Sequence, residues 1–324
     1  MNQAATSDVT EAAENNKLLR YARHLLLEPF GLEAQKKLTE ASVLVIGAGG
    51  LGAAALPYLA ASGVGRIVVA DGDTVDLTNL QRQVIHNEAA IGFNKAISAK
   101  KRLDEINSTI LIEAIPSNLN EYLLDAHVSQ ADLVLDCSDN FRTRHDINLA
   151  CVRHKKKLVS GAAIRFDGQV TSFDFSRHNS PCYACLFPAI ELTPNVAGCA
   201  TQGPAKDTLA GGQESDGDAE NCATMGVLSP LVGVIGSMQA VEAIRLLSGL
   251  ADTKQPELGR LQLFDARSFT WRELRFRRDF LCKVCGDIEA SSAAQDTRNA
   301  DASGLGNSEQ EHKNIPTYLE TEHA

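Results

Sequence analysis

The feature that most constrains this chain is a glycine-rich loop between an apolar strand and a helix of small residues. The run from Gly47 to Gly52 reads Gly-Ala-Gly-Gly-Leu-Gly and matches the G-x-G-x-x-G pattern. Residues 42–46 before it predict a buried strand, and residues 53–61 after it predict a helix. Glycine lets a backbone turn tightly and approach a phosphate, and a helix N-terminus offers N–H groups and a positive dipole. We therefore expect a nucleotide site, with NAD, FAD and ATP all open as the ligand. Its glycines would be Gly47, Gly49, Gly50 and Gly52.

Strand-like and helix-like segments alternate along the next part of the chain. Apolar runs that predict strands lie at 66–70, 109–115, 131–135 and 157–160, and helical patterns lie at 94–106 and 140–153. Strands separated by helices indicate βαβ units and a parallel sheet. Longer antiparallel strands are expected at 164–175, 260–265 and 270–276. We expect an α/β fold with a Rossmann-like, mostly parallel sheet that antiparallel strands extend.

The length and the uneven charge of the chain indicate its domain organisation. A chain of 324 residues allows one large domain or two ordinary ones. Residues 287–324 hold eight acidic and two basic residues, and residues 203–220 are rich in glycine and aspartate. We expect a flexible N-terminus over 1–16, one domain over 17–286 with a mobile crossover loop at about 187–222, and a disordered acidic tail over 287–324.

Composition argues against two classes of partner. The formal net charge of −10 is unlike that of a nucleic-acid binder, which needs a basic surface. The most apolar stretch, 225–250, includes Pro230, Glu242 and Arg245, so it predicts a buried helix and no membrane span. Residues 1–17 show no signal peptide. We expect a cytoplasmic protein, in which cysteines are thiols or metal ligands more often than disulfides.

Charged and polar residues follow the predicted strands. Asp71 ends the second strand, where an acid can bind ribose hydroxyls. Asp139 follows the fourth strand, where a carboxylate can hold Mg²⁺ against phosphate oxygens. Arginine and lysine near a phosphate loop suit the triphosphate of ATP, on which negative charge shifts during phosphoryl or nucleotidyl transfer. Four residues between these two acids are candidates to contact the nucleotide, namely Asp73, Asn79, Arg82 and Lys95.

Two Cys-x-x-Cys pairs predict a metal site. Each pair can offer two thiolates to one metal, so the four sulfurs would complete a closed tetrahedral zinc site. No ligand position would stay open for catalysis, so we interpret the zinc as structural. A redox disulfide is the alternative for one pair. The four ligands would be Cys182, Cys185, Cys282 and Cys285.

The other cysteines and the histidines differ by position. Cys137 and Cys151 are expected to be small buried side chains. Cys222 lies where the mobile loop meets a helix, and a cysteine near a helix N-terminus can have a lowered pKa and react as the thiolate. His86, like the other histidines, has no partner at metal-ligand spacing and is expected to be an ordinary polar residue.

Together these motifs resemble the ThiF/MoeB/HesA family, the bacterial relatives of ubiquitin-activating enzymes. The resemblance runs over about residues 17–286 and includes Leu-Leu-Arg20-Tyr-Ala-Arg23, the glycine loop, the run from Asp71 to Arg82, Lys95, and Asp136-Cys-Ser-Asp-Asn140. It implies an enzyme that uses ATP to adenylate the C-terminal glycine of a ubiquitin-like sulfur-carrier protein ending in Gly-Gly. It also implies a homodimer, in which Arg23 reaches the active site of the other subunit.

The resemblance gives the site residues roles. The attacking carboxylate is already ionised at pH 7, so no general base is required. Catalysis would be positioning and electrostatic stabilisation of negative charge. The roles implied are charge stabilisation for Arg23, Arg82 and Lys95, hydrogen-bond donation for Asn79, Mg²⁺ binding for Asp139 and ribose binding for Asp71.

Several alternatives stay open. Residues 160–165 and 167–169 look more like the molybdopterin branch of the family, and residues 221–224 and 270–272 look more like the thiamin branch. Cys222 matches the ThiF cysteine that bonds to the carrier, but a separate sulfur-donor protein would make it unnecessary. Outside the family, the alternatives are an NAD-dependent oxidoreductase with the same glycine loop and a non-catalytic scaffold that binds carriers.

Overall fold

The computed structural model of the protein describes residues 19–188, 226–250 and 258–286. The predictions for residues 1–16, for the crossover loop beyond 188 and for the tail over 287–324 fall outside this part of the chain, as does Cys222.

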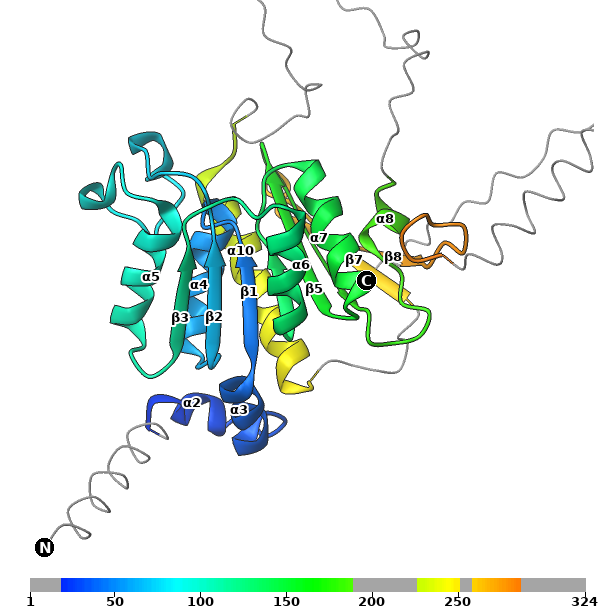
Figure 1. Ribbon diagram of the computed structural model, residues 1–324, viewed down its shortest axis with the longest axis horizontal. Coiled ribbons are helices and arrows are strands. Elements are labelled where there is room, and N and C mark those ends of the chain that lie inside the picture. The colour runs from blue at the N-terminus through cyan, green and yellow to red at the C-terminus, as the bar shows by residue number, and fades with distance from the viewer. Residues whose placement is uncertain (1–18, 189–225, 251–257, 287–324) are drawn as a thin grey trace, which may run out of the picture.

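One mixed sheet of eight strands organises the described residues (Figure 1). Its order is β3-β2-β1-β4-β5-β6-β7-β8. The first five strands in this order are parallel, and β6, β7 and β8 continue antiparallel from β5. The expected parallel sheet with an antiparallel extension is confirmed. The strands are β1 (Ser42–Ile46), β2 (Arg66–Ala70), β3 (Leu111–Ile115), β4 (Leu133–Asp136), β5 (Lys157–Ile164), β6 (Asp167–Asp174), β7 (Leu258–Asp265) and β8 (Thr270–Arg277).

Helices cover both faces of the sheet (Figure 1). They are α2 (Ala22–Leu25), α3 (Gly31–Glu40), α4 (Gly50–Ala61), α5 (Lys95–Ile106), α6 (Glu121–Gln130), α7 (Phe141–Arg153), α8 (Tyr183–Leu186) and α10 (Ser229–Ser248). Successive residues of β1 face opposite layers because side chains alternate along a strand. Val43 and Val45 pack in the core that includes α4, α5 and α10, whereas Leu44 and Ile46 pack in the core with α6, α7 and α8.

Helix α10 is a core helix, as the sequence predicts. By length and composition it could cross a membrane, but half of its most apolar window is buried within the protein. It packs against α4 and against β5 and β6. Its Glu242 and Arg245 form an ion pair at 2.7 Å, and its Gln239 is fully buried. These contacts make α10 part of a helical layer on the sheet.

Helix α4 begins at Gly50, whereas the sequence predicts a start at Ala53. Glycine has a low helix propensity, so the sequence does not indicate a helix over the first turn of α4, which contains Gly50 and Gly52. Packing explains why glycine is nevertheless present, because a Cβ on Gly52 would lie 2.0 Å from the carbonyl oxygen of Gly47.

Strand β5 continues to Ile164, although the sequence predicts its end at Ser160. The small residues that follow Ser160 look in the sequence like the end of a strand, but in the structure they make room for side chains that pack against β5. A Cβ on Gly161 would lie 2.4 Å from the side chain of Gln239, so glycine admits this buried amide against the strand. Ile164 therefore belongs to β5, and β6 starts only after a turn at Arg165, where φ is 53°.

Asparagine caps fix two helix starts near the ends of the parallel strands. The side chain of Asn94 accepts hydrogen bonds at the start of α5 and also donates to the carbonyl of Asp71. The side chain of Asn140 accepts from the Thr143 N–H at the start of α7. A side-chain oxygen at this position satisfies an N–H group that the helix cannot. The caps thereby place the residues next to them at the carboxyl edge of the sheet.

Candidate functional site

A cavity of about 810 Å³ lies at the carboxyl ends of the parallel strands. The strand order reverses between β1 and β4, since β2 and β3 lie on one side of β1 and β4 lies on the other. Ligands bind at such reversals in open α/β sheets because the two connections diverge and leave a crevice. The cavity brings together most of the residues that the sequence selected. They are Gly47, Gly49, Gly50, Asp71, Asp73, Arg82, Lys95 and Asp139.

The glycine loop aims a buried helix at this cavity. Gly47 has a φ of +99°, and a Cβ there would lie 2.6 Å from the Cys137 carbonyl oxygen. Gly49 is the N-cap of α4, and Gly50 is its first residue. Gly52 is not among the residues that line the cavity, but its missing side chain lets α4 pack against the end of β1. The N–H groups of the first helical turn therefore face a space that can hold phosphate.

Asp71 connects the glycine loop to the turn after β2. Its Oδ2 accepts the Ala48 N–H at 2.7 Å, and its Oδ1 accepts the Asp73 N–H at 2.8 Å. Burial raises the pKa of Asp71, and the two backbone hydrogen bonds and Lys95 oppose this shift. A carboxylate offers about four lone-pair sites, so acceptor capacity remains for ribose hydroxyls.

Lys95 and Arg82 provide positive charge at the cavity wall. The Lys95 side chain is 8% exposed, and its Nζ lies 2.8 Å from an Oδ2 of Asp73, whose side chain is 67% exposed. Arg82 donates from its guanidinium to the Thr78 carbonyl at 3.1 Å. A cation with little access to water interacts more strongly with a phosphate than a fully solvated one, because the local dielectric is lower.

Asp139 reaches the cavity from a tightly held turn after β4. The buried Asp136 carboxylate accepts both the N–H and the O–H of Ser138, at 3.0 and 2.6 Å. Asp139 itself is exposed and lines the cavity. An exposed carboxylate beside a phosphate-binding loop fits Mg²⁺, which prefers oxygen ligands and binds through few carboxylates plus substrate phosphates.

Besides Gly52, two further predicted residues of the nucleotide site do not line the cavity. Asn79 closes a capping box in the loop after β2, where its side-chain oxygen accepts the Asp76 N–H at 3.2 Å. Arg23 is exposed on α2, which lies at the opposite edge of the sheet (Figure 1). Its neighbour Arg20 bonds to the carbonyl of Ile106, at the far end of the helix that Lys95 begins. Within one chain, Arg23 is thus remote from the cavity.

His86 makes structural contacts that the sequence does not reveal. It is buried, not an ordinary polar residue: its Nε2 contacts the Ala48 carbonyl at 3.0 Å, and its Nδ1 contacts the Ser98 hydroxyl at 2.8 Å. The carbonyl can only accept, so Nε2 is the donor and Nδ1 the acceptor. Burial lowers the pKa of His86. His86 therefore links the glycine loop to α5, a contact that no local sequence pattern signals.

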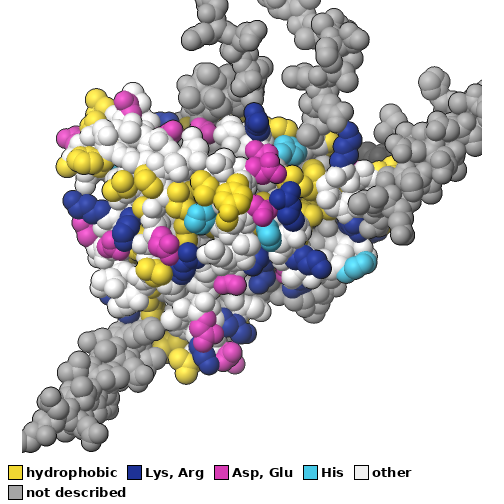
Figure 2. Space-filling view, in the orientation of Figure 1, with side chains coloured by type: hydrophobic (Ala, Val, Ile, Leu, Met, Phe, Trp, Pro, Cys, Tyr) yellow, Lys and Arg dark blue, Asp and Glu magenta, His cyan; other side chains and the backbone are white. Residues whose placement is uncertain are grey.

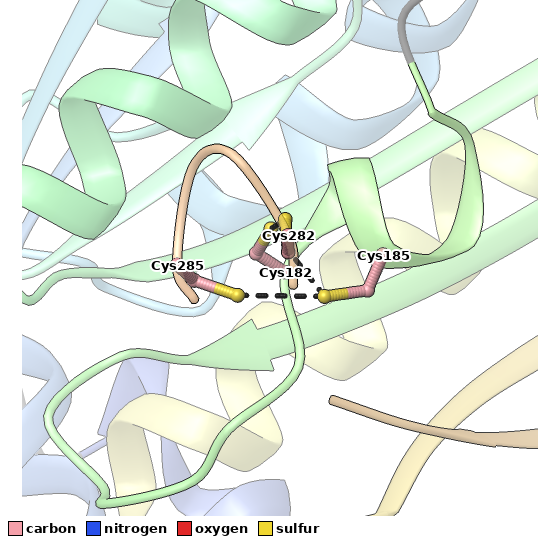
Figure 3. Close-up of side chains that lie close together, drawn as sticks. All are labelled: Cys182, Cys185, Cys282 and Cys285. Atoms are coloured by element: carbon pink, nitrogen blue, oxygen red, sulfur yellow. Dashed lines mark hydrogen bonds between the residues drawn. The ribbon is translucent and has the colours of Figure 1, made fainter. Parts of the chain in front are cut away.

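The four cysteines of the two Cys-x-x-Cys pairs converge (Figure 3). Cys182 precedes the short helix α8 and Cys185 lies within it, whereas Cys282 and Cys285 lie in the turn after β8. The sulfur of Cys182 lies 3.8 Å from that of Cys185 and 3.7 Å from that of Cys282, and the sulfur of Cys185 lies 3.4 Å from that of Cys285. Zinc–sulfur bonds of about 2.3 Å in a tetrahedron imply sulfur separations of about 3.8 Å. The donor set and spacing fit a structural zinc.

Hydrogen bonds support the cysteine cluster, defined as Cys182, Cys185, Cys282 and Cys285. The Asp279 N–H donates to the Cys185 sulfur at 3.4 Å, and Arg278 donates to the Cys285 carbonyl at 2.9 Å. Such contacts orient metal ligands. The cluster ties the end of the antiparallel extension to α8.

The remaining predicted cysteines are settled in part. Cys137 and Cys151 are buried, as expected, and burial raises the pKa of both thiols. Burial and a raised pKa both disfavour the thiolate form at these two positions. Cys222 lies outside the described residues, so its role stays a prediction.

The face that carries α6 and α7 has mixed character. Lysine and arginine side chains are scattered among acidic ones, and hydrophobic side chains form a band across the face (Figure 2). This face offers no continuous basic surface of the kind that binds nucleic acid.

Comparison with known proteins decides the family. Residues 21–284 match the ThiF family model. The chain belongs to the ThiF family. A similar relative is a molybdopterin-synthase adenylyltransferase of Salmonella typhimurium, 40% identical over 272 residues that cover 84% of this chain and 98% of that protein. The sulfur carrier protein ThiS adenylyltransferase of Escherichia coli is 39% identical over 84% of this chain and 96% of its own length.

Two further comparisons extend this ThiF-family assignment. The adenylyltransferase and sulfurtransferase MOCS3 of Xenopus laevis is 38% identical over 87% of this chain, which spans only 56% of that longer protein. Among solved structures, E. coli MccB with ATP has a TM-score of 0.64 at 22% identity and covers 83% of this chain and 75% of its own. At that identity the likeness supports the fold alone.

Proposed function

We propose that this protein is an ATP-dependent adenylyltransferase that activates the C-terminal glycine carboxylate of a ubiquitin-like sulfur-carrier protein. The cavity at the strand reversal carries the proposal, because a helix N-terminus, Lys95 and Arg82 meet there. Membership of the ThiF family and identities near 40% to adenylyltransferases support it. They disfavour an NAD-dependent oxidoreductase, and the intact set of charged residues disfavours a non-catalytic scaffold.

The reaction follows from the chemistry of two anions. A carrier carboxylate oxygen attacks the α-phosphorus of ATP, a new oxygen–phosphorus bond forms, and the bond to pyrophosphate breaks. The products are a carrier acyl-adenylate and pyrophosphate, and no proton is transferred because the carboxylate is already ionised. The protein must hold both anions and stabilise the charge that moves to pyrophosphate. Lys95, Arg82 and the N-terminus of α4 are placed to do this by fixed electrostatics.

The acids of the cavity have separate tasks in this proposal. Asp71, held by two backbone N–H groups, accepts ribose hydroxyls. Asp139 carries Mg²⁺, which would neutralise phosphate charge when bound. Asp73 holds Lys95 at the cavity through their ion pair. Asn79 would serve as a neutral donor through its side-chain N–H₂ group, since its side-chain oxygen already accepts the Asp76 N–H.

A homodimer is part of the proposal. Arg23 is exposed and remote from the cavity of its own chain, so it can assist catalysis only in another subunit. Helix α10 also exposes Val234 and Val241, at 38% and 57%, on one side. Apolar side chains at this spacing share a helical face and suit a protein contact.

The identity of the carrier and the source of sulfur are the remaining parts of the proposal. The carrier is of ThiS or MoaD type, for thiamin or molybdopterin biosynthesis, and the nearly equal identities of 40% and 39% do not separate the branches. Cys222, or a persulfide on it, would displace AMP from the acyl-adenylate; otherwise a separate sulfur-donor protein does so. We expect this chemistry in the cytoplasm.

The experiment that tests the proposal is exchange of labelled pyrophosphate into ATP, with ThiS-type and MoaD-type carriers ending in Gly-Gly. Exchange should require the carrier and its last glycine. A folded protein that gives no exchange with either carrier type, and whose melting temperature rises with NAD but not with ATP, would contradict the proposal.

A further inference from the structure

Arg144 is a buried charge that the proposed reaction does not use. It lies on α7 at the cavity wall, and only 7% of it is exposed. Burial of a guanidinium is unfavourable unless its hydrogen bonds are satisfied. Arg144 donates to the Ser138 carbonyl at 2.6 Å, and its charge also interacts with the side chain of Tyr183, which lines the same cavity. These contacts lead to two different parts of the molecule.

The first contact holds the residue directly before Asp139. The Asp136 carboxylate also fixes the turn from Asp136 to Asp139. It accepts the Ser138 N–H and the hydroxyl of Ser160 on the neighbouring strand β5, the latter at 2.7 Å. The guanidinium of Arg144 holds the opposite, carbonyl side of the same turn. The main chain next to Asp139 is therefore clamped on both sides, which limits where its carboxylate can point.

The second contact leads to the cysteine cluster. Tyr183 lies between Cys182 and Cys185 and is 3% exposed. Its backbone N–H donates to the Asn148 side chain at 2.9 Å. The position of the Tyr183 hydroxyl thus depends on the segment that carries two cysteines of the cluster.

The charge of Arg144 suits this clamp. Burial by itself would lower the pKa of Arg144, but Asp136 and Tyr183 outweigh it and keep the pKa above its usual value. The group therefore stays charged, and a hydrogen bond from a charged donor is roughly twice as strong as a neutral one.

We propose that Arg144 is a positioning residue that fixes the Asp139 carboxylate for a divalent cation, and that Tyr183 makes this clamp depend on the order of the cysteine cluster. The inference rests on the proposed function in one respect, namely that Asp139 carries Mg²⁺. Arg144 itself touches neither the cation nor the reacting atoms in this scheme.

The test compares ATP affinity with and without Mg²⁺, measured by calorimetry on the full-length, zinc-loaded protein. Arg144→Met should reduce the Mg²⁺-dependent gain in ATP affinity about 10-fold, and Tyr183→Phe about 3-fold, while ATP alone binds as in wild type. Arg142→Met is the matched control, because Arg142 is an exposed arginine on the same helix outside the cavity lining. It should behave as wild type.

A second pair of variants separates positioning from a general structural role. In an Asp139→Asn background, adding Arg144→Met should cause no further loss, because coupled residues are not additive. The inference would be overturned if Arg144→Met lowered the Mg²⁺-dependent gain in ATP affinity as much in the Asp139→Asn background as in wild type. It would also be overturned if Arg144→Met weakened the binding of ATP without Mg²⁺. If Arg144→Met does not fold, Arg144→Lys and Tyr183→Phe provide the same comparison. Wild type that binds no ATP would contradict the proposed function, whereas unaltered Mg²⁺ dependence in the variants would contradict this inference alone.

Discussion

Lys95 is the residue on which the proposed charge stabilisation depends most directly. Its side chain is 8% exposed and is held at the cavity by Asp73. Lys95→Ala should lower pyrophosphate exchange about 100-fold or more, the scale for losing one preorganised charge-stabilising donor. Lys101→Ala, an exposed lysine on the same helix, is the control and should leave exchange unchanged. Near-normal exchange by Lys95→Ala would reject its assignment to the phosphates.

His86 makes the stability of the protein sensitive to pH. Burial lowers its pKa below the ordinary 6.5, so the unfolded chain binds a proton more readily than the folded one. Between the lowered value and 6.5, stability must therefore fall as the pH falls. Denaturant unfolding at about pH 7.5 and about pH 5.5 measures this effect. Wild type should lose more stability on acidification than His86→Gln, which cannot titrate. An equal loss in both proteins would show that His86 is not responsible.

The cavity residues that the sequence predicts are those whose position follows from the order of strands and helices along the chain. Asp71, Lys95 and Asp139 follow strands or open helices, and parallel strands bring these positions to one edge. Arg144 and His86 could not be predicted, because their partners at Ser138, Tyr183 and Ala48 come from packing between elements. Asn79 does not line the cavity, since its side chain caps the 3-10 turn of its own loop.

At the scale of elements, the cysteine cluster joins the helix α8 to the turn after β8. The purified protein should contain about one zinc per chain, because four thiolates form a closed site. Cys282→Ser should lower the melting temperature more than it lowers exchange at low temperature and saturating Mg²⁺, because metal binding contributes folding free energy. Metal analysis and thermal unfolding check this. Zinc-free protein with four titratable thiols would rule the site out.

The types of the predicted strands and of the helices α4, α5, α7 and α10 were correct and their limits less so, whereas α3 and α6 were not predicted. Strands β1 and β2 match their predicted bounds because each is an apolar run between breakers. Helix α4 and strand β5 extend beyond prediction, at Gly50 and Gly161, since glycine has low propensity for both structures. In each case tertiary packing, and not propensity, decided the boundary.

At the scale of the whole molecule, the position of Arg23 requires a second subunit if this residue takes part in catalysis. Arg23→Ala should impair exchange as strongly as Lys95→Ala, although Arg23 is remote from its own cavity. If the residue acts across a dimer interface, mixing Arg23→Ala with Lys95→Ala subunits should restore activity, because some mixed dimers contain one complete site. No recovery after confirmed subunit exchange would count against sharing between subunits.

The fold places the proposed ATP site at the carboxyl edge of the sheet. The strand reversal creates the cavity, the helices aim their N-termini at it, and the cysteine cluster secures the far end of the sheet. The choice of carrier is not contained in these features, because it depends on surface contacts with another protein.

Mass spectrometry of the carrier after incubation with the protein, ATP and Mg²⁺, without a sulfur donor, tests the proposed activation most directly. A carrier ending in Gly-Gly should gain the mass of one adenylyl group, and ATP should release pyrophosphate. The gain should be absent with Lys95→Ala and with a carrier that lacks its last glycine. If wild-type protein that is folded, zinc-loaded and able to bind ATP leaves both ThiS-type and MoaD-type carriers unmodified, it does not activate a sulfur carrier.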